Sequence, residues 1–125
     1  MKDSNWDLDY RDGLIGESKV ADLLSIDTIE VKTDRRWQET GNVYIETDCY
    51  YMNSQAWEPS GISISKATHW AFVLDEVVVI LPLDRLKKIV ERFGRPTTCN
   101  IAPNYSRGFL ISVVELMAVI RDNKE

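Results

Sequence analysis

Reactive residue types are scarce in this sequence. It contains one histidine and two cysteines, Cys49 and Cys99, whose separation matches no metal-binding spacing. A Ser-His-Asp or Cys-His triad has little support, because there is a single histidine and no nucleophile-elbow motif. We expect both cysteines to be free thiols, since disulfides are rare in reducing compartments.

Long apolar runs are absent as well. The longest, in EVVVILPL, is far shorter than the roughly 20 residues that span a bilayer. The N-terminal segment MKDSNWDLDYRD lacks the basic-then-apolar order of a signal peptide. We therefore expect a soluble, cytoplasmic protein.

The size and charge of the chain limit its organisation. With 125 residues and 44% hydrophobic content, it suits a single domain spanning residues 1–125. The formal net charge of −5 argues against a protein that holds nucleic acid by bulk charge. Any contact with DNA must therefore be local.

Apolar periodicity and turn residues predict the order helix, strand, strand, turn, strand, strand, helix, helix. Helix ends are marked by Gly94, a common residue after a helix, and by Ser112 with Glu115, a capping-box pattern. This order indicates an α/β fold in which helices flank a mixed sheet. The expected helices cover residues 10–24, 63–68, 83–94 and 112 onward, the expected strands cover 28–34, 41–52, 69–75 and 76–82, and residues 95–108 are expected to be irregular.

Residues 29–34, IEVKTD, alternate apolar and charged side chains, which is typical of a strand with one buried face. The charged face carries Glu30, Lys32 and Asp34 in one row. Two interpretations are open at this point. The row is either a solvated strand face or half of an active site.

The first expected helix carries a carboxylate among apolar residues. At about 100° per residue, Glu17 lies near the centre of a stripe formed by Tyr10, Leu14, Val20, Ala21 and Leu24. Burial of an unpaired carboxylate costs several kcal/mol or raises its pKa. Glu17 therefore needs a cation, a metal ion or a set of hydrogen-bond donors.

The pairing of the first two strands supplies a further clue. If residues 35–41 close a symmetric antiparallel hairpin, Glu30 lies opposite Glu46. Like charges in a direct cross-strand pair are destabilising. We expect either Lys32 or a divalent cation to lie between the two carboxylates.

These residues resemble the PD-(D/E)xK nuclease superfamily. The resemblance rests on a helix with GExxVxxLL at residues 16–24, on the E-x-K element at residues 30–32, and on the later TGN and SGI segments. It covers residues 12–75 and is closest to small phage-encoded members similar to Holliday-junction resolvases. It implies a restriction-endonuclease-like mixed β-sheet flanked by α-helices, and a Mg²⁺-dependent (or Mn²⁺-dependent) homodimeric endonuclease. Its substrate would be DNA, including branched or recombination intermediates, in the cytoplasm of the host cell.

The resemblance also implies roles for individual residues. Glu30 would bind the metal, and Lys32 would orient the attacking water and stabilise charge on the phosphate. Glu17 matches the helix glutamate that completes the site in resolvase-like members. Members of the superfamily usually carry an aspartate on a strand before E-x-K, but only about three residues separate the helix and strand here.

Three carboxylates are candidates for that missing aspartate. Asp27 is the nearest, but strand alternation would put it on the face opposite Glu30. Asp34 follows the strand, and Glu46, across the expected hairpin, is geometrically the better replacement.

Basic residues around this site are candidates for DNA contacts. Arg35 and Arg36, followed by Trp37, begin the loop after the E-x-K strand. Lys66 follows Gly61 in SGISISKA, where a glycine permits close backbone approach to a phosphate. The alternative for each is an ordinary exposed charge.

Other residues have a simpler interpretation. His69, beside an aromatic residue at a strand start, is more consistent with packing than with general-base catalysis. The basic residues of the later helix, Arg85, Lys87 and Lys88, fit a solvated face. Trp6 and Trp57 are candidates for core, rim or dimer contacts.

A competing hypothesis keeps the fold without the reaction. In this case the chain is a non-catalytic module that binds DNA or a protein. Two features favour this hypothesis: the net negative charge, and the short spacing between the first helix and the E-x-K element. Affinity for Mg²⁺ would discriminate between the two.

Overall fold

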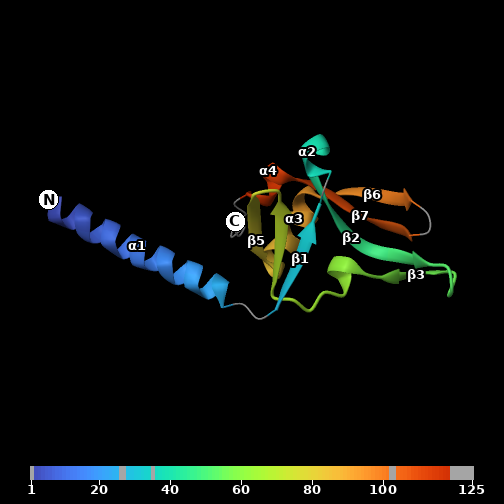
Figure 1. Cartoon of the computed structure of the whole chain (residues 1–125), viewed down its shortest axis with the longest axis horizontal. Helices are drawn as coiled ribbons and strands as arrows, with labels where there is room; N and C mark the ends of the chain where they lie inside the picture. Colours follow the sequence, from blue (N-terminus) through green and yellow to red (C-terminus); the bar gives the residue numbers. More distant parts are fainter. Residues whose placement is uncertain (1, 26–27, 35, 102–103, 119–125) are drawn as a thin grey trace, which may run out of the picture.

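The computed structural model describes residues 2–25, 28–34, 36–101 and 104–118. Within these ranges the chain is a mixed α/β protein with two β-sheets flanked by helices (Figure 1). No helix in this part of the chain is both long enough and apolar enough to cross a membrane.

The strands of the described residues form two sheets, one of three strands in the order β1-β4-β5 and one of four in the order β3-β2-β7-β6. β1 is parallel to β4, and the other neighbouring strands are antiparallel. The strands are β1 (Ile29–Thr33), β2 (Asn42–Tyr51), β3 (Ala56–Pro59), β4 (His69–Leu74), β5 (Val77–Pro82), β6 (Arg95–Ile101) and β7 (Asn104–Ser112).

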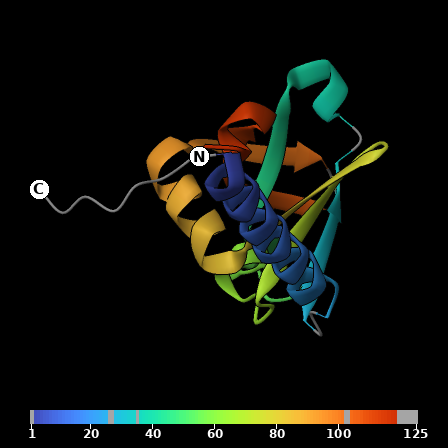
Figure 2. The ribbon, with the colours of Figure 1, turned by 90° about the vertical axis from the view of Figure 1, so that its left-hand side faces the viewer.

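The helix α3 packs against both sheets. Its buried side chains Leu83, Leu86 and Ile89 recur at helical spacing. It contacts β4 and β5 of the first sheet, β7 of the second, and α4, which lies beside it on one flank of the strands (Figure 2). The helical segments are α1 (Lys2–Leu24), α2 (Trp37–Thr40), the 3-10 helix η1 (Gly61–Ser63), α3 (Leu83–Phe93) and α4 (Val113–Leu116).

The hydrophobic core is shared by the two sheets, α3 and α4. Burial of these apolar side chains is the main force that joins the two sheets. The largest fully buried side chains are Val43, Ile45, Trp70, Phe72, Leu86, Ile89, Ile111 and Leu116.

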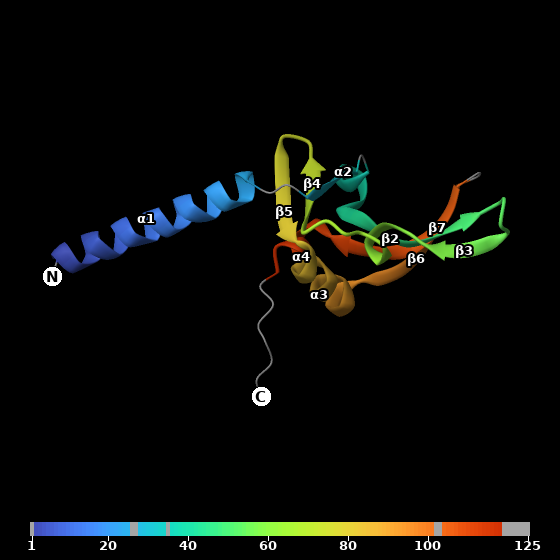
Figure 3. The same cartoon turned by 90° about the horizontal axis from the view of Figure 1, so that it is seen from below.

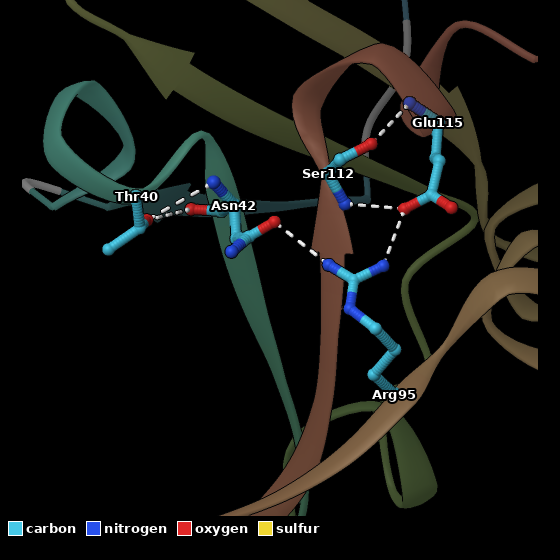
Figure 4. A network of polar contacts seen from close by, with 5 residues as sticks. All are labelled: Thr40, Asn42, Arg95, Ser112 and Glu115. Atoms are coloured by element: carbon cyan, nitrogen blue, oxygen red, sulfur yellow. Dashed lines mark hydrogen bonds and ion pairs between the residues drawn. The ribbon is translucent and has the colours of Figure 1, made fainter.

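A polar network ties β2 and β6 to the start of α4 (Figure 4). Ser112 Oγ accepts a hydrogen bond from the Glu115 N–H at 3.0 Å, and the Ser112 N–H donates to Glu115 Oε1 at 2.8 Å, which confirms the expected capping box. Arg95 donates to Glu115 Oε1 at 3.0 Å and to Asn42 Oδ1 at 2.9 Å. The Ser112 N–H, followed by the Arg95 guanidinium, holds the pKa of Glu115 below its ordinary value of 4.5.

Several expected elements are confirmed. The structure has strands over residues 29–33, 42–51, 69–74 and 77–82, and a helix over 83–93. The helix expected over residues 10–24 is present but begins earlier, at Lys2.

The hairpin expected between the first two strands is wrong. β1 pairs in parallel with β4, which puts Glu30 opposite Trp70, whereas β2 pairs with β7, which puts Glu46 opposite Gly108. The reason lies in the connection, where α2 ends on Gly41 in a left-handed conformation (φ 72°). This helical turn leads the chain out of the first sheet and into the second.

The irregular segment expected over residues 95–108 is also wrong. These residues form β6 and the first part of β7, which pair with each other. Pro96 is compatible with this strand, because β6 is the edge strand of its sheet and one side of it needs no ladder hydrogen bond.

Two details of the expected helices need correction. The short helix over residues 63–68 is replaced by the earlier 3-10 helix η1, after which Ser65 Oγ accepts a hydrogen bond from Trp70 Nε1 at 3.0 Å. Gly94 caps α3 with an extended backbone (φ −62°), not a left-handed one. Space accounts for glycine there, since a Cβ atom would lie 2.9 Å from Phe109 Cδ1.

The environment expected for Glu17 is wrong. Its helix α1 extends away from both sheets (Figures 1 and 3), and Glu17 is exposed, as are its apolar neighbours Leu14, Val20 and Leu24. The helical stripe is present, but no core covers it in the described chain. The argument that a buried Glu17 must have a partner therefore does not apply.

Candidate active site

The charged face of β1 lies on the same side of its sheet as the hydrophobic core. Paired residues of neighbouring strands share a face, so Glu30 and Lys32 lie on the face of buried Trp70 and Phe72. Val31, on the opposite face, is 57% exposed. β1 is an edge strand, so both side chains keep part of their exposure, 43% for Glu30 and 41% for Lys32.

Lys32 has a defined environment on this edge. Its Nζ lies 3.7 Å from Glu30 Oε1 and 5.2 Å from the centroid of the Trp70 ring. The indole is held in turn by its hydrogen bond to Ser65. A partly exposed ion pair adds little to stability, so its main effect is to orient the ammonium group of Lys32.

The residues of the E-x-K element share a surface pocket with two other charged residues. The pocket has a volume of about 310 Å³ and combines side chains of β1, β2 and the segment after η1. Two carboxylates and two ammonium groups thus meet at one place, although they come from three separate parts of the sequence. The lining residues are Glu30, Lys32, Glu46, Gly61, Ile64, Ser65, Lys66 and Ala67.

The backbone of Glu46 is held between two glycines. The β2–β7 pairing has a bulge between Glu46 and Asp48, a feature that re-aims side chains and is common beside active sites. A Cβ atom on Gly108 would overlap the Ile45 carbonyl oxygen and lie 2.8 Å from Glu46 Cα. On the other side, Gly61 has a positive φ of 54°, and a Cβ atom there would overlap the Glu46 carbonyl oxygen.

Asp34 has a structural role in this arrangement. Its Oδ1 accepts a hydrogen bond from the Arg36 N–H at 2.9 Å, and its Oδ2 accepts one from the Tyr44 N–H at 3.3 Å. It therefore links the end of β1 to α2 and β2, and it does not line the pocket of Glu30 and Glu46.

A second surface pocket of about 600 Å³ is lined by Asp34, Arg36 and Tyr44 among other residues. The Tyr44 hydroxyl lies 2.9 Å from Ser106 Oγ. The pKa of Tyr44 is raised above its ordinary value of 10.0, chiefly by burial, with a smaller contribution from the negative charge of Glu46.

The remaining sequence candidates lie elsewhere. Glu17 lies on α1, beside Gly13 and Val20, and the structure does not bring it to the pocket of Glu30. Asp27 and Arg35 lie outside the described residues. His69 Nδ1 lies 3.0 Å from the Thr68 hydroxyl at the start of β4, which agrees with a packing role.

The pocket offers two carboxylates as possible ligands for Mg²⁺, Glu30 and Glu46. Among the described residues there is no group of three or more His, Cys, Asp or Glu side chains placed to hold a metal ion. Mg²⁺ is usually bound by only one or two carboxylates, with water and substrate phosphate as the other ligands. Glu30 and Glu46 are thus of the ligand type that Mg²⁺ takes, and they line the same pocket.

Sequence reasoning missed two parts of this site. Trp70, which lies under Lys32, was expected only as a strand residue. Gly108 had a recognisable signal, because a glycine inside a strand often marks a bulge or a close backbone approach.

Comparisons of the chain with family models, with curated proteins and with solved structures gave no match. The functional assignment therefore depends on the chemistry of the pocket.

Proposed function

We propose that this protein is a Mg²⁺-dependent endonuclease that hydrolyses phosphodiester bonds in DNA, with branched or recombination intermediates as its substrates. The observation that carries the proposal is the pocket in which Glu30, Lys32, Glu46 and Lys66 meet. Carboxylates for a metal and ammonium groups for a phosphate are the residue types that this reaction requires. The resemblance of residues 30–32 to an E-x-K element supports the same conclusion.

Each pocket residue has a role in the proposed reaction. Glu30 and Glu46 would hold Mg²⁺, which supplies Lewis-acid activation of the phosphate and of the attacking water. Lys32, oriented by Glu30 and Trp70, donates a hydrogen bond to a phosphate oxygen and stabilises the charge that develops there. Lys66 binds a neighbouring phosphate and positions the DNA backbone.

Substitution of Lys32 tests the proposal. We expect Lys32→Ala to reduce Mg²⁺-dependent cleavage of a supercoiled plasmid and of a four-way junction by about 100-fold or more, the usual effect of removing one transition-state donor. Lys87→Ala, which removes an exposed ammonium group from α3, is the matched control and should cut at the wild-type rate. Thermal melts of all three proteins establish that the fold is retained. Equal cleavage by wild type and Lys32→Ala would refute the assignment.

A second function has a specific observation in its favour. The Glu30 carboxylate already forms an ion pair with Lys32, and the described carboxylates do not form a three-ligand metal group. Both facts are compatible with a module that binds DNA or a protein without cutting it. Isothermal titration with Mg²⁺ and Mn²⁺ separates the two functions: the nuclease should bind a metal ion in wild type, and Glu46→Gln should weaken that binding.

The homodimer implied by the resemblance is part of the proposal. Resolvase-like action on two strands requires two active sites. Light scattering after gel filtration should give twice the mass of 14.4 kDa if this is correct.

A further inference from the structure

An aromatic and basic cluster lies on the four-stranded sheet outside the pocket. The rings of Tyr50 on β2 and Trp57 on β3 meet edge to face, with centroids 5.6 Å apart. The Arg107 guanidinium on β7 lies 4.5 Å from the centroid of the Trp57 ring. Trp57 is 39% exposed, and the Arg107 side chain is 50% exposed. We call these three residues the Trp57 cluster.

The register of the strands places the cluster on one face of the sheet. Tyr50 pairs with Trp57, and Asp48 pairs with Arg107. Residues Asp48 and Tyr50 alternate with Cys49, so their side chains share a face. The Trp57 cluster is thus a row across three neighbouring strands.

Arg107 is oriented by further contacts. Its Nε lies 3.3 Å from Asp48 Oδ2. The hydroxyl of Thr47, the bulge residue that follows Glu46, lies 2.9 Å from the same carboxylate oxygen and 3.2 Å from the Arg107 carbonyl oxygen. The bulge that positions Glu46 therefore also positions the guanidinium over Trp57.

The chemistry of the cluster favours a flat, uncharged partner. Asp48 offsets the charge of Arg107, which weakens its attraction for phosphate, but the planar guanidinium and indole still offer stacking surfaces. Exposed aromatic rings and Arg planes of this kind bind unpaired bases, because every base has a π face. Bases within a duplex are stacked on each other and cannot reach such a surface.

We propose that the Trp57 cluster binds an unpaired base of single-stranded DNA. The proposal rests on the proposed nuclease function and specifies its substrate as DNA with a single-stranded segment. Trp57 precedes Gly61 of the pocket by four residues, which limits their separation to about 13 Å along an extended chain. Arg107 and Gly108 are consecutive on β7, so the cluster and Glu46 lie on opposite faces of this sheet, and a DNA strand that reaches both would pass around its β3 edge.

Fluorescence anisotropy tests the proposal with a labelled thymidine oligonucleotide and a labelled duplex of the same length, in Ca²⁺ without Mg²⁺. We expect Trp57→Ala to weaken binding of the single strand by about 10-fold or more and to leave duplex binding unchanged. Trp57→Phe keeps an aromatic face and should retain most of the affinity. Tyr51→Ala removes an exposed ring from the next position of β2, on the opposite face, and is the matched control.

The outcomes distinguish this proposal from the proposed function. Loss of single-strand affinity in Trp57→Ala, but not in Tyr51→Ala, supports the Trp57 cluster, whether or not the protein cleaves DNA. Unchanged single-strand affinity in a folded Trp57→Ala, an equal loss for duplex and single strand, or no single-strand binding by wild type overturns it. None of these outcomes changes whether cleavage depends on Lys32. The base-binding proposal and the nuclease proposal can therefore fail independently.

Discussion

Replacement of Gly108 by alanine tests the way in which the structure holds Glu46. The added methyl group would overlap the Ile45 carbonyl oxygen and lie 2.8 Å from Glu46 Cα. Both neighbours are backbone atoms of a paired strand, so they cannot move aside as a flexible side chain can. The substitution must therefore separate β2 from β7 at the bulge.

The expected cost follows from this overlap. Overpacking a closed site costs about 1–3 kcal/mol, and the involvement of backbone puts Gly108→Ala at the upper end, about 2–3 kcal/mol. For a chain of this size the melting temperature should fall by roughly 6–15 °C. Gly13→Ala is the matched control, since a Cβ atom there meets nothing within 4 Å. In an exposed helix interior, it should stabilise the protein by about 0.5–1 kcal/mol.

The same variant has a functional readout. If Gly108 positions Glu46 as a metal ligand, Mg²⁺ should raise the melting temperature of wild type and Gly13→Ala more than that of Gly108→Ala, because only a ligand that binds the native state stabilises it. Differential scanning fluorimetry with and without Mg²⁺ measures both effects. A Gly108→Ala protein that melts with wild type would refute the close packing of β2 on β7. A destabilised protein with a full Mg²⁺ response would refute the link between Gly108 and metal binding.

Two further substitutions follow from the structure. Glu17→Gln should change the free energy of unfolding by less than about 0.5 kcal/mol and leave the Mg²⁺ response intact, because Glu17 is exposed on α1; a weaker Mg²⁺ response would show that α1 reaches the pocket. Glu115 has a pKa below 4.5 in the folded state, so its stabilising contribution is present above that value and is lost as the pH falls through the folded pKa. Glu115→Gln should accordingly lose stability at neutral pH and show a smaller further loss on acidification than wild type, as urea unfolding across this range would measure; parallel pH profiles for the two proteins would contradict the assignment.

Local signals account for the elements that the sequence predicted well. The strands β4 and β5 are joined by a turn at Asp75 and Glu76, and Asp75 adopts a left-handed conformation (φ 64°) that aspartate tolerates. The capping box of Ser112 and Glu115 lies within four consecutive residues. Such features depend on neighbours in the chain, so the sequence contains them directly.

The candidate site was predictable only in part. Glu30, Lys32, Glu46 and Lys66 were recognised as residues of suitable chemistry, and the structure brings them to one pocket. The geometric reason given for joining Glu30 to Glu46 was nevertheless wrong, because the two strands do not pair.

The sequence by itself determined the type and approximate limits of most helices and strands, because the spacing of apolar side chains and the capping residues act over a few positions. Only the tertiary structure decided the partners of those strands. The strand β1 could pair with any exposed edge. Its choice of β4, about forty residues later, depends on the turn made by α2 and on burial of Trp70 and Phe72. That choice puts Glu30 and Lys32 on the face of Trp70 and Phe72, and the approach of Gly61 and Gly108 to Glu46 completes the pocket. Contacts between residues far apart in the chain depend on the packing of the whole domain, which no local pattern specifies.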